Sequence, residues 1–246
     1  MAPVFDFAAT EAGLTDILKL VRRLLPGDRI ELGVLAAIFV GAAAALCFGL
    51  LTSEMVEGET QAFDKAVLLA FRNPANLADP VGPPWLVDAV RDVTSLGSTA
   101  LLTLIVIASA GYLLLDDKRA SALLLLVSVI GGSLLSQAMK AAFGRTRPDI
   151  VPHLMTETSL SFPSGHAMNS AVLYLTLGAL LARAQDGRRQ QAYVFGVALF
   201  VAFVVGLSRV YLGVHWPTDV LAGWSVGAAW AMGCVLAATW LERRRG

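Results

Sequence analysis

The chain has 246 residues, of which 56% are apolar and 15% charged, and its formal net charge is zero. Soluble domains carry about a quarter of charged residues, so this composition excludes an ordinary soluble domain and favours a membrane protein. The neutral balance gives no indication of nucleic-acid binding. The two cysteines, Cys47 and Cys234, lie in apolar runs, which fits neither a disulfide framework nor a metal cluster.

The first 29 residues lack the compact apolar stretch of a cleaved signal peptide. Apolar residues recur there at helical spacing, with basic residues between them: Leu14, Ile17, Leu18, Val21 and Leu25, interrupted by Lys19, Arg22 and Arg23. This pattern predicts a basic amphipathic helix on the cytoplasmic membrane surface, with a frayed terminus as the alternative. We therefore divide the chain into a cytoplasmic segment, residues 1–29, and a membrane domain, residues 30–246.

Six long charge-free segments follow, and we expect each to cross the bilayer. They are residues 32–52, 98–115, 120–139, 167–182, 192–208 and 220–241. A spanning helix needs roughly 17 to 25 residues, and backbone groups cannot remain unpaired in lipid, so helices are the expected form. The predicted fold is all-α: a polytopic membrane protein with six transmembrane helices in one bundle.

The largest segment outside the predicted spans is residues 53–97. Within it, residues 61–72 place Phe63, Val67, Leu68 and Phe71 on one helical face, and Pro74 follows. This pattern predicts an interfacial helix in an outer loop.

The distribution of lysine and arginine predicts the orientation. Twelve of the 19 fall on the side of the two termini and 7 on the other, which places both termini in the cytoplasm. Trp85 and Trp216 fall near outer boundaries and Trp240 near an inner one, as in an aromatic belt, and we assign Tyr211 to the outer belt as well.

Polar residues gather in three short outer segments, residues 140–148, 161–166 and 208–219. Because the third to sixth spans must pack together, these segments can meet near the outer surface. Lys140, Arg147 and Arg209 supply three positive charges there, and guanidinium groups match phosphate oxygens bidentately. Ser164 and Gly165 precede a helix, where free amides favour an anion and glycine permits close approach.

The same segments hold two of the three histidines, His166 and His215. His215 and Asp219 are four residues apart, close enough for the carboxylate to accept a ring N–H and leave the other nitrogen free to attack. His166 can then act as a general acid. A lone arginine at a helix end often contacts headgroups, and a lone histidine is often structural, but their coincidence on one face favours phosphoryl transfer.

The pattern Lys-x6-Arg-Pro, Pro-Ser-Gly-His, Ser-Arg-x5-His-x3-Asp resembles the signature of the type 2 phosphatidate phosphatase (PAP2) superfamily, in its integral-membrane branch. The matching residues are Lys140, Arg147, Pro148, Pro163, Ser164, Gly165, His166, Ser208, Arg209, His215 and Asp219. Soluble relatives with this motif include vanadate-binding haloperoxidases, and the six charge-free spans argue against that branch.

The resemblance implies that His215 attacks phosphorus, that Asp219 orients it, and that His166 protonates the leaving group and later activates water. It implies a phosphate site made of Lys140, Arg147, Ser164, Gly165 and Arg209, with no metal and no cofactor. Arg145 is extra to the motif and is given a supporting role at most.

The expected function is hydrolysis of a lipid phosphate or diphosphate at the non-cytoplasmic rim of a bacterial inner membrane, so the active site faces the periplasm or cell exterior. Undecaprenyl diphosphate, a cell-wall carrier, is the favoured substrate by family frequency, with phosphatidate or phosphatidylglycerophosphate as alternatives. The expected partners are this lipid and the bilayer, without metal or nucleic acid, and the oligomeric state is left open.

A lipid transporter or flippase is the alternative from another class. Transporters place ionisable groups near the midplane, whereas the predicted spans carry none between their ends. Gly223 and Gly227 form a small-x3-small pair that allows close packing, either within the bundle or against another subunit.

Overall fold

The computed structural model describes residues 32–245, so the amphipathic helix expected within residues 1–29 lies outside the described part of the chain. The elements in chain order are α2 (Leu32–Glu57), α3 (Gln61–Ala70), β1 (Arg72–Asn73), β2 (Asn76–Pro80), α4 (Pro84–Ser95), α5 (Thr99–Leu115), α6 (Arg119–Phe143), α7 (Gly165–Arg183), α8 (Arg188–Tyr211) and α9 (Pro217–Arg245). The strands β1 and β2 form a small antiparallel hairpin.

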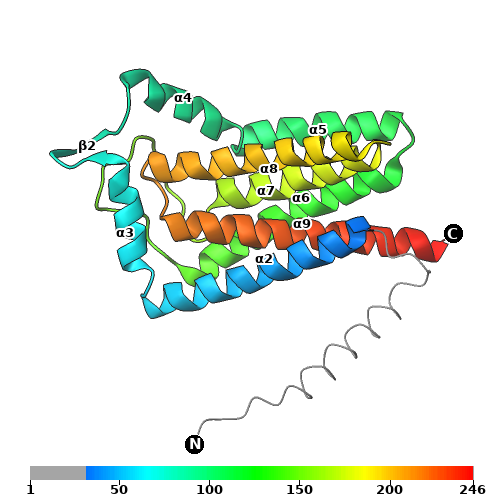
Figure 1. The fold of residues 1–246 in the computed structure, drawn as a ribbon, viewed down its shortest axis with the longest axis horizontal. Helices are drawn as coiled ribbons and strands as arrows, with labels where there is room; N and C mark the ends of the chain where they lie inside the picture. Colours follow the sequence, from blue (N-terminus) through cyan, green and yellow to red (C-terminus); the bar gives the residue numbers. More distant parts are fainter. Residues whose placement is uncertain (1–31, 246) are drawn as a thin grey trace, which may run out of the picture.

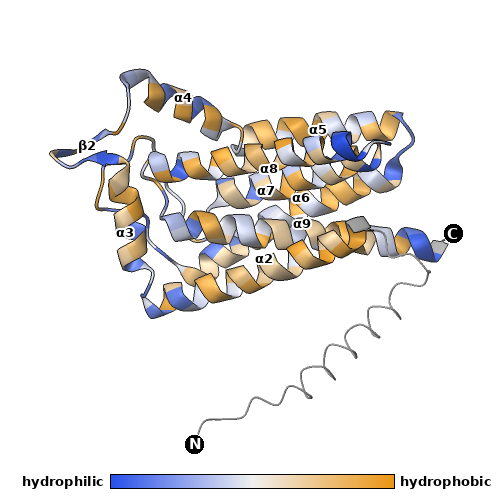
Figure 2. Ribbon diagram, viewed as in Figure 1, coloured by the Kyte–Doolittle hydropathy of each residue, from blue (hydrophilic) through white to orange (hydrophobic). Residues whose placement is uncertain are grey.

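The long helices confirm the predicted all-α membrane fold. Five of them are long and apolar enough to cross a bilayer alone: Val34–Glu57, Arg119–Phe143, Gly165–Arg183, Arg188–Tyr211 and Pro217–Arg244. The remaining predicted span, residues 98–115, corresponds to α5, which has 17 residues and meets the length and hydropathy of a span only together with α4, across a 44° bend. Apolar residues run along the bundle and hydrophilic residues gather at its ends (Figure 2).

Helices α7 and α9 form the centre of the bundle. Helix α2 packs along α9, while α6 and α8 flank α7 and α5 packs against α6. The helix α2 begins, and α9 ends, at the same end of the bundle (Figure 1). Outward faces keep large apolar side chains exposed, among them Phe39, Ile107 and Leu115, as lipid-facing surfaces do.

The close contact between α7 and α9 depends on Gly223 and Gly227. A Cβ at Gly223 would lie 2.8 Å from the carbonyl oxygen of Ser164, and one at Gly227 would lie 2.7 Å from that of Met168. Both separations are too short for a side chain, so this glycine pair packs inside the bundle. It brings the beginning of α9 against the beginning of α7.

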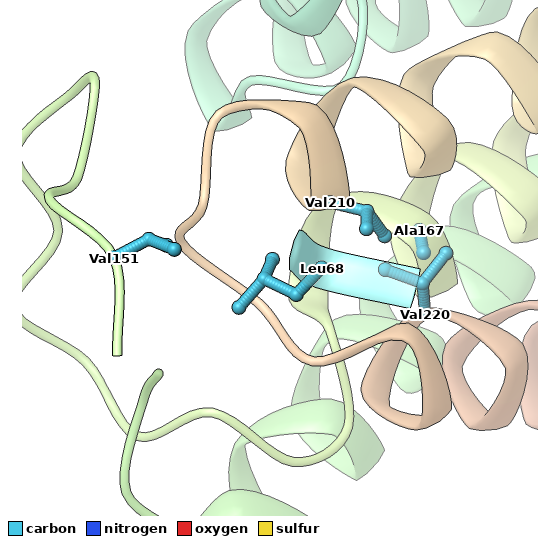
Figure 3. Close-up of a cluster of buried hydrophobic side chains, with 5 residues drawn as sticks. All are labelled: Leu68, Val151, Ala167, Val210 and Val220. Carbon is cyan, nitrogen blue, oxygen red and sulfur yellow. The ribbon is translucent and has the colours of Figure 1, made fainter. Parts of the chain in front are cut away.

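Helix α3 lies across the end of the bundle (Figure 1). Its Leu68 is fully buried in a cluster with Val151, Ala167, Val210 and Val220, which come from a loop and three helices (Figure 3). A helix was predicted here, but part of it docks into the protein, since Asp64 and Leu68 are both buried. Phe63 remains exposed.

The assignment of Tyr211 to an aromatic belt is wrong. Its side chain is buried, its hydroxyl donates to the Val81 carbonyl at 3.0 Å, and its ring meets Phe71 edge-on at 5.9 Å. The chain that follows α3 folds over the end of α8 and covers this residue. Trp85 is exposed, whereas Trp216 is partly covered and donates to the Thr146 carbonyl at 3.2 Å.

Candidate active site

The three predicted segments meet at the end of the bundle that α3 crosses. The backbone amide of Ser164 donates to the carbonyl of Asp219 at 2.9 Å, which joins the second segment to the third. The guanidinium of Arg147 donates to the carbonyl of Val214 at 2.6 Å, which joins the first to the third. Two residues let the chain turn at the helix ends beside the site. Gly144 ends α6 in the left-handed region, at φ +60°, and Pro217 begins α9.

Asp219 holds its place through two sets of contacts. In the first turn of α9, its Oδ2 accepts the backbone N–H of Trp216 at 2.9 Å, as a carboxylate in a capping box does. The same oxygen accepts the Ser161 hydroxyl and lies 3.4 Å from Nδ1 of His215. The hydroxyl of Ser161 is also 3.3 Å from this nitrogen. The expected His–Asp pair is therefore present, with Ser161 as a third member that sequence reasoning gave no role.

Two arginines of the predicted phosphate site converge on Glu157. Arg209 is fully buried and contacts Oε1 of Glu157, while its Nη1 donates to the Thr94 hydroxyl at 3.0 Å. Nη2 of Arg147 lies 3.5 Å from Oε2 of Glu157. Burial alone would raise the pKa of Glu157, but the positive charges of Arg209 and Arg147 lower it below its ordinary value. An ionised carboxylate thus lies between the two guanidinium groups that we expect to bind phosphate.

The remaining members of the predicted phosphate site surround the beginning of α7. Nζ of Lys140 donates to the carbonyl of Leu160. The hydroxyl of Ser164 is buried and has no hydrogen-bond partner among the described residues. A Cβ at Gly165 would lie 3.6 Å from Cε of Lys140. A buried unpaired hydroxyl beside cations at a helix N-terminus suits an anionic ligand.

His215 is buried with its Nε2 toward Arg147. Its Nε2 lies 3.2 Å from Nη1 of Arg147, a distance at which the ring nitrogen accepts when Nδ1 carries the proton. Burial lowers the pKa of His215 well below its ordinary value, and the neighbouring positive charges, Arg147 first, lower it further. The resting imidazole is therefore neutral, the form that a nucleophile needs.

His166 lies in the first turn of α7, near Glu157 and His215. The junction between α4 and α5 closes over its ring at Gly97, where a Cβ would lie 3.2 Å from Cδ2 of His166 and 2.4 Å from Cγ1 of Val205. Packing against this glycine fixes one side of the His166 ring.

Arg145, which the sequence analysis gives a supporting role at most, contacts two buried carboxylates. Its Nη1 donates to Oδ1 of Asp219 at 2.6 Å and its Nη2 donates to Oδ2 of Asp64 at 2.7 Å. Asp64 could have been noticed in the sequence, because it is an acid four residues before Leu68 and therefore on the apolar face of its helix. Glu157 carried no comparable signal, since it lies in an irregular loop.

Within residues 32–245, no group of three or more His, Cys, Asp or Glu side chains is placed to hold a metal ion. Hydrolysis without a metal remains a prediction.

The fold and the residues at one end of it fit an integral-membrane phosphatase: a helical bundle with three cations and two histidines gathered at that end. The family described as the PAP2 superfamily matches residues 121–243. The chain is 37% identical over 175 residues to phosphatidylglycerophosphatase B of Bacillus subtilis, which covers 70% of this chain and 79% of that protein. It is 32% identical over 107 residues to undecaprenyl-diphosphatase of Sulfolobus acidocaldarius, covering 42% and 48%.

The fold matches the crystal structure of the first transmembrane PAP2-type phosphatidylglycerolphosphate phosphatase from Bacillus subtilis. The TM-score is 0.66 at 27% identity, over 85% of this chain and 96% of that one. The chain belongs to the PAP2 superfamily, and it is a membrane lipid phosphate hydrolase.

Proposed function

We propose that the protein hydrolyses a lipid phosphomonoester at the outer membrane face through a phosphohistidine on His215. The observation that carries this proposal is the placement of His215: Nδ1 faces the Asp219 carboxylate, and Nε2 faces the cations. A neutral imidazole held in this way presents one unprotonated nitrogen to a bound phosphate.

The reaction has two steps. In the first, Nε2 of His215 forms a bond to phosphorus while the bond from phosphorus to the lipid oxygen breaks, and His166 gives a proton to that oxygen. In the second, water attacks phosphorus, His166 takes a proton from the water, and the N–P bond breaks to release orthophosphate. The cations and the Ser164 and Gly165 groups stabilise the phosphoryl oxygens throughout.

The charge of the site favours a monophosphate. Lys140, Arg147 and Arg209 are balanced in part by the carboxylate of Glu157, which is ion-paired with both arginines. Among these four side chains two positive charges remain, which matches a phosphomonoester, since it carries about −1.5 to −2 at pH 7. Phosphatidylglycerophosphate is the first candidate, because the relative matched over 79% of its length is a phosphatidylglycerophosphatase. Undecaprenyl diphosphate is the second, because a relative matched over 48% of its length acts on it.

Three experiments test the proposal. His215→Ala is expected to reduce phosphate release from phosphatidylglycerophosphate by at least about 10⁴-fold, as removal of a nucleophile does, and to abolish labelled phosphoenzyme trapped in alkali. Unchanged release would overturn the nucleophile. A panel of phosphatidylglycerophosphate, phosphatidate and undecaprenyl diphosphate decides the substrate, and a fast rate on the diphosphate alone would overturn the charge argument. Activity lost in EDTA and restored by a divalent metal would contradict a metal-free reaction.

A further inference from the structure

A chain of alternating charges runs from α3 to the side of Asp219 that faces away from His215. Asp64 on α3 contacts Arg145 at 2.7 Å, and Arg145 contacts Asp219 at 2.6 Å. The exposed fraction of the side chain is 1% for Asp64, 15% for Arg145 and 0% for Asp219. Such buried pairs hold one geometry, because solvent cannot replace the partner of either carboxylate.

The two nitrogens of the Arg145 fork are divided between the carboxylates. Nη1 serves Oδ1 of Asp219 and the Thr218 hydroxyl, at 2.6 and 2.8 Å, and Nη2 serves Asp64. The guanidinium also lies over the ring of Trp216, 5.7 Å from its centroid. Arg145 therefore fixes the oxygen of Asp219 that His215 and Ser161 leave unused.

Asp64 also fixes the beginning of α9. Its Oδ1 accepts the backbone N–H of Thr218 at 2.9 Å, and its Oδ2 accepts the Thr218 hydroxyl at 2.7 Å. The amides of a first helical turn have no partner within the helix, so Asp64 caps α9 from another element. Asp219 belongs to that same turn, so both its backbone and its carboxylate depend on Asp64.

The charge of Asp64 has a consequence for the reaction. When His215 is phosphorylated its ring becomes positive, and the Asp219 carboxylate stabilises that charge. Arg145 alone would oppose this stabilisation, because it places a cation on the far side of the same carboxylate. Asp64 offsets that cation, so Arg145 can hold Asp219 while the negative charge of Asp219 still acts on His215.

We propose that Asp64 and Arg145 are positioning residues for hydrolysis: Asp64 holds Arg145, Arg145 holds Asp219, and Asp219 holds the nucleophile. This inference rests on the proposed role of His215. It assigns a function to α3, which lies outside the three motif segments, and to an arginine that is extra to the family signature.

The first test separates kcat from KM. Asp64→Asn keeps the shape and an oxygen for the Thr218 amide but removes the charge from Arg145. We expect kcat to fall about 10- to 100-fold, the usual loss when a residue supporting an active-site group is changed, with KM within about threefold because neither Asp64 nor Arg145 contacts the phosphate-binding side chains. Asp79→Asn is the matched control: it makes the same chemical change at an exposed position of the outer segment and is expected to retain wild-type kcat. A wild-type kcat in Asp64→Asn would overturn the proposal.

The second test asks whether Asp64 acts through Arg145. In a double-mutant cycle, Asp64→Asn added to Arg145→Gln should lower kcat by no more than about twofold beyond Arg145→Gln alone, because coupled residues are non-additive. Fully multiplicative losses would overturn the chain of contacts.

If Asp64→Asn does not yield folded protein, Arg145→Lys replaces it, since one ammonium cannot bridge two carboxylates in the way a guanidinium does. A wild-type kcat in Arg145→Lys would also contradict the inference. His215→Ala separates failure of the proposed function from failure of the positioning role. Activity retained in that variant overturns the proposed function. An inactive His215→Ala beside a fully active Asp64→Asn overturns the positioning role alone.

Discussion

At Glu157, the site carries its own anion. The carboxylate contacts both Arg147 and Arg209, so an incoming phosphate must compete with it for the same donors. Glu157→Gln removes the competing charge, and we expect orthophosphate to inhibit the variant about tenfold more strongly, which corresponds to about 1.4 kcal/mol. The measurement is product inhibition by phosphate at pH 7.

The control for Glu157 is Glu242→Gln. Glu242 pairs with Arg183 at 3.8 Å near the C-terminal end of α9, and both side chains are largely exposed, so the substitution removes an acid without touching the anion site. Phosphate inhibition in this control should equal that of the wild type. Weaker inhibition in Glu157→Gln than in the wild type would contradict the competition between Glu157 and phosphate.

His215 makes stability depend on pH. Burial lowers its pKa in the folded protein, while the unfolded chain keeps a value near 6.5, so below about pH 6.5 the unfolded state binds the additional proton. Stability attributable to this residue is therefore lost as the pH falls, by up to about 1.4 kcal/mol per unit. In detergent micelles, the melting temperature of the wild type should drop more between pH 7 and pH 5 than that of His215→Gln. Parallel curves for the two proteins would refute a buried neutral ring.

At the scale of elements, the packing of α7 against α9 depends on the absence of a side chain at Gly227. A Cβ at Gly227 would meet the Met168 carbonyl oxygen at 2.7 Å, and backbone cannot move aside as a side chain can. Gly227→Ala should lower the free energy of unfolding by about 1–3 kcal/mol, the usual cost of overpacking, and reduce activity by separating Asp219 from Ser164. Thermal melting and phosphate release measure the two effects.

Gly233 offers a matched control on the same helix, because a Cβ there meets nothing within 4 Å. Gly233→Ala should be neutral or stabilising by up to about 1 kcal/mol, since alanine is the better helix former. Equal melting temperatures for Gly227→Ala and Gly233→Ala would show that the stability of the protein does not depend on the close α7–α9 contact.

The elements also show what the sequence could predict. The spans were predictable because an apolar run of sufficient length is helical in lipid wherever it packs, and the motif segments because each lies at the end of a span. Tyr211 was misassigned because its environment depends on how residues 71–81 fold back over α8. The partners of Glu157 and Asp64 could not be predicted, because they lie 52 and 81 residues away in sequence and only the path of the outer segments brings them together.

For the whole molecule, the site and the termini of the described bundle lie at opposite ends (Figure 1). The charged and polar groups of the site gather at one end of the bundle, where a phosphate headgroup would lie with its acyl chains in the bilayer. In the long helices α2 and α5 to α9, Asp, Glu, Lys, Arg and His occur only in the terminal turns. This distribution suits chemistry at one rim and disfavours a transport path through the midplane.

The charges at the two ends of the bundle predict its orientation in the membrane, and this prediction can be tested directly. The excess of lysine and arginine at the end of the termini predicts that this end is cytoplasmic, and therefore that the site faces outward. In a background with Cys47 and Cys234 replaced by alanine, Asp79→Cys places a thiol on the outer hairpin, and Asp186→Cys places one in the α7–α8 loop; both positions are exposed. A membrane-impermeant maleimide should label Asp79→Cys in intact spheroplasts and Asp186→Cys only after permeabilisation. The reverse pattern would place the site in the cytoplasm, and hydrolysis would then act on lipids of the inner leaflet.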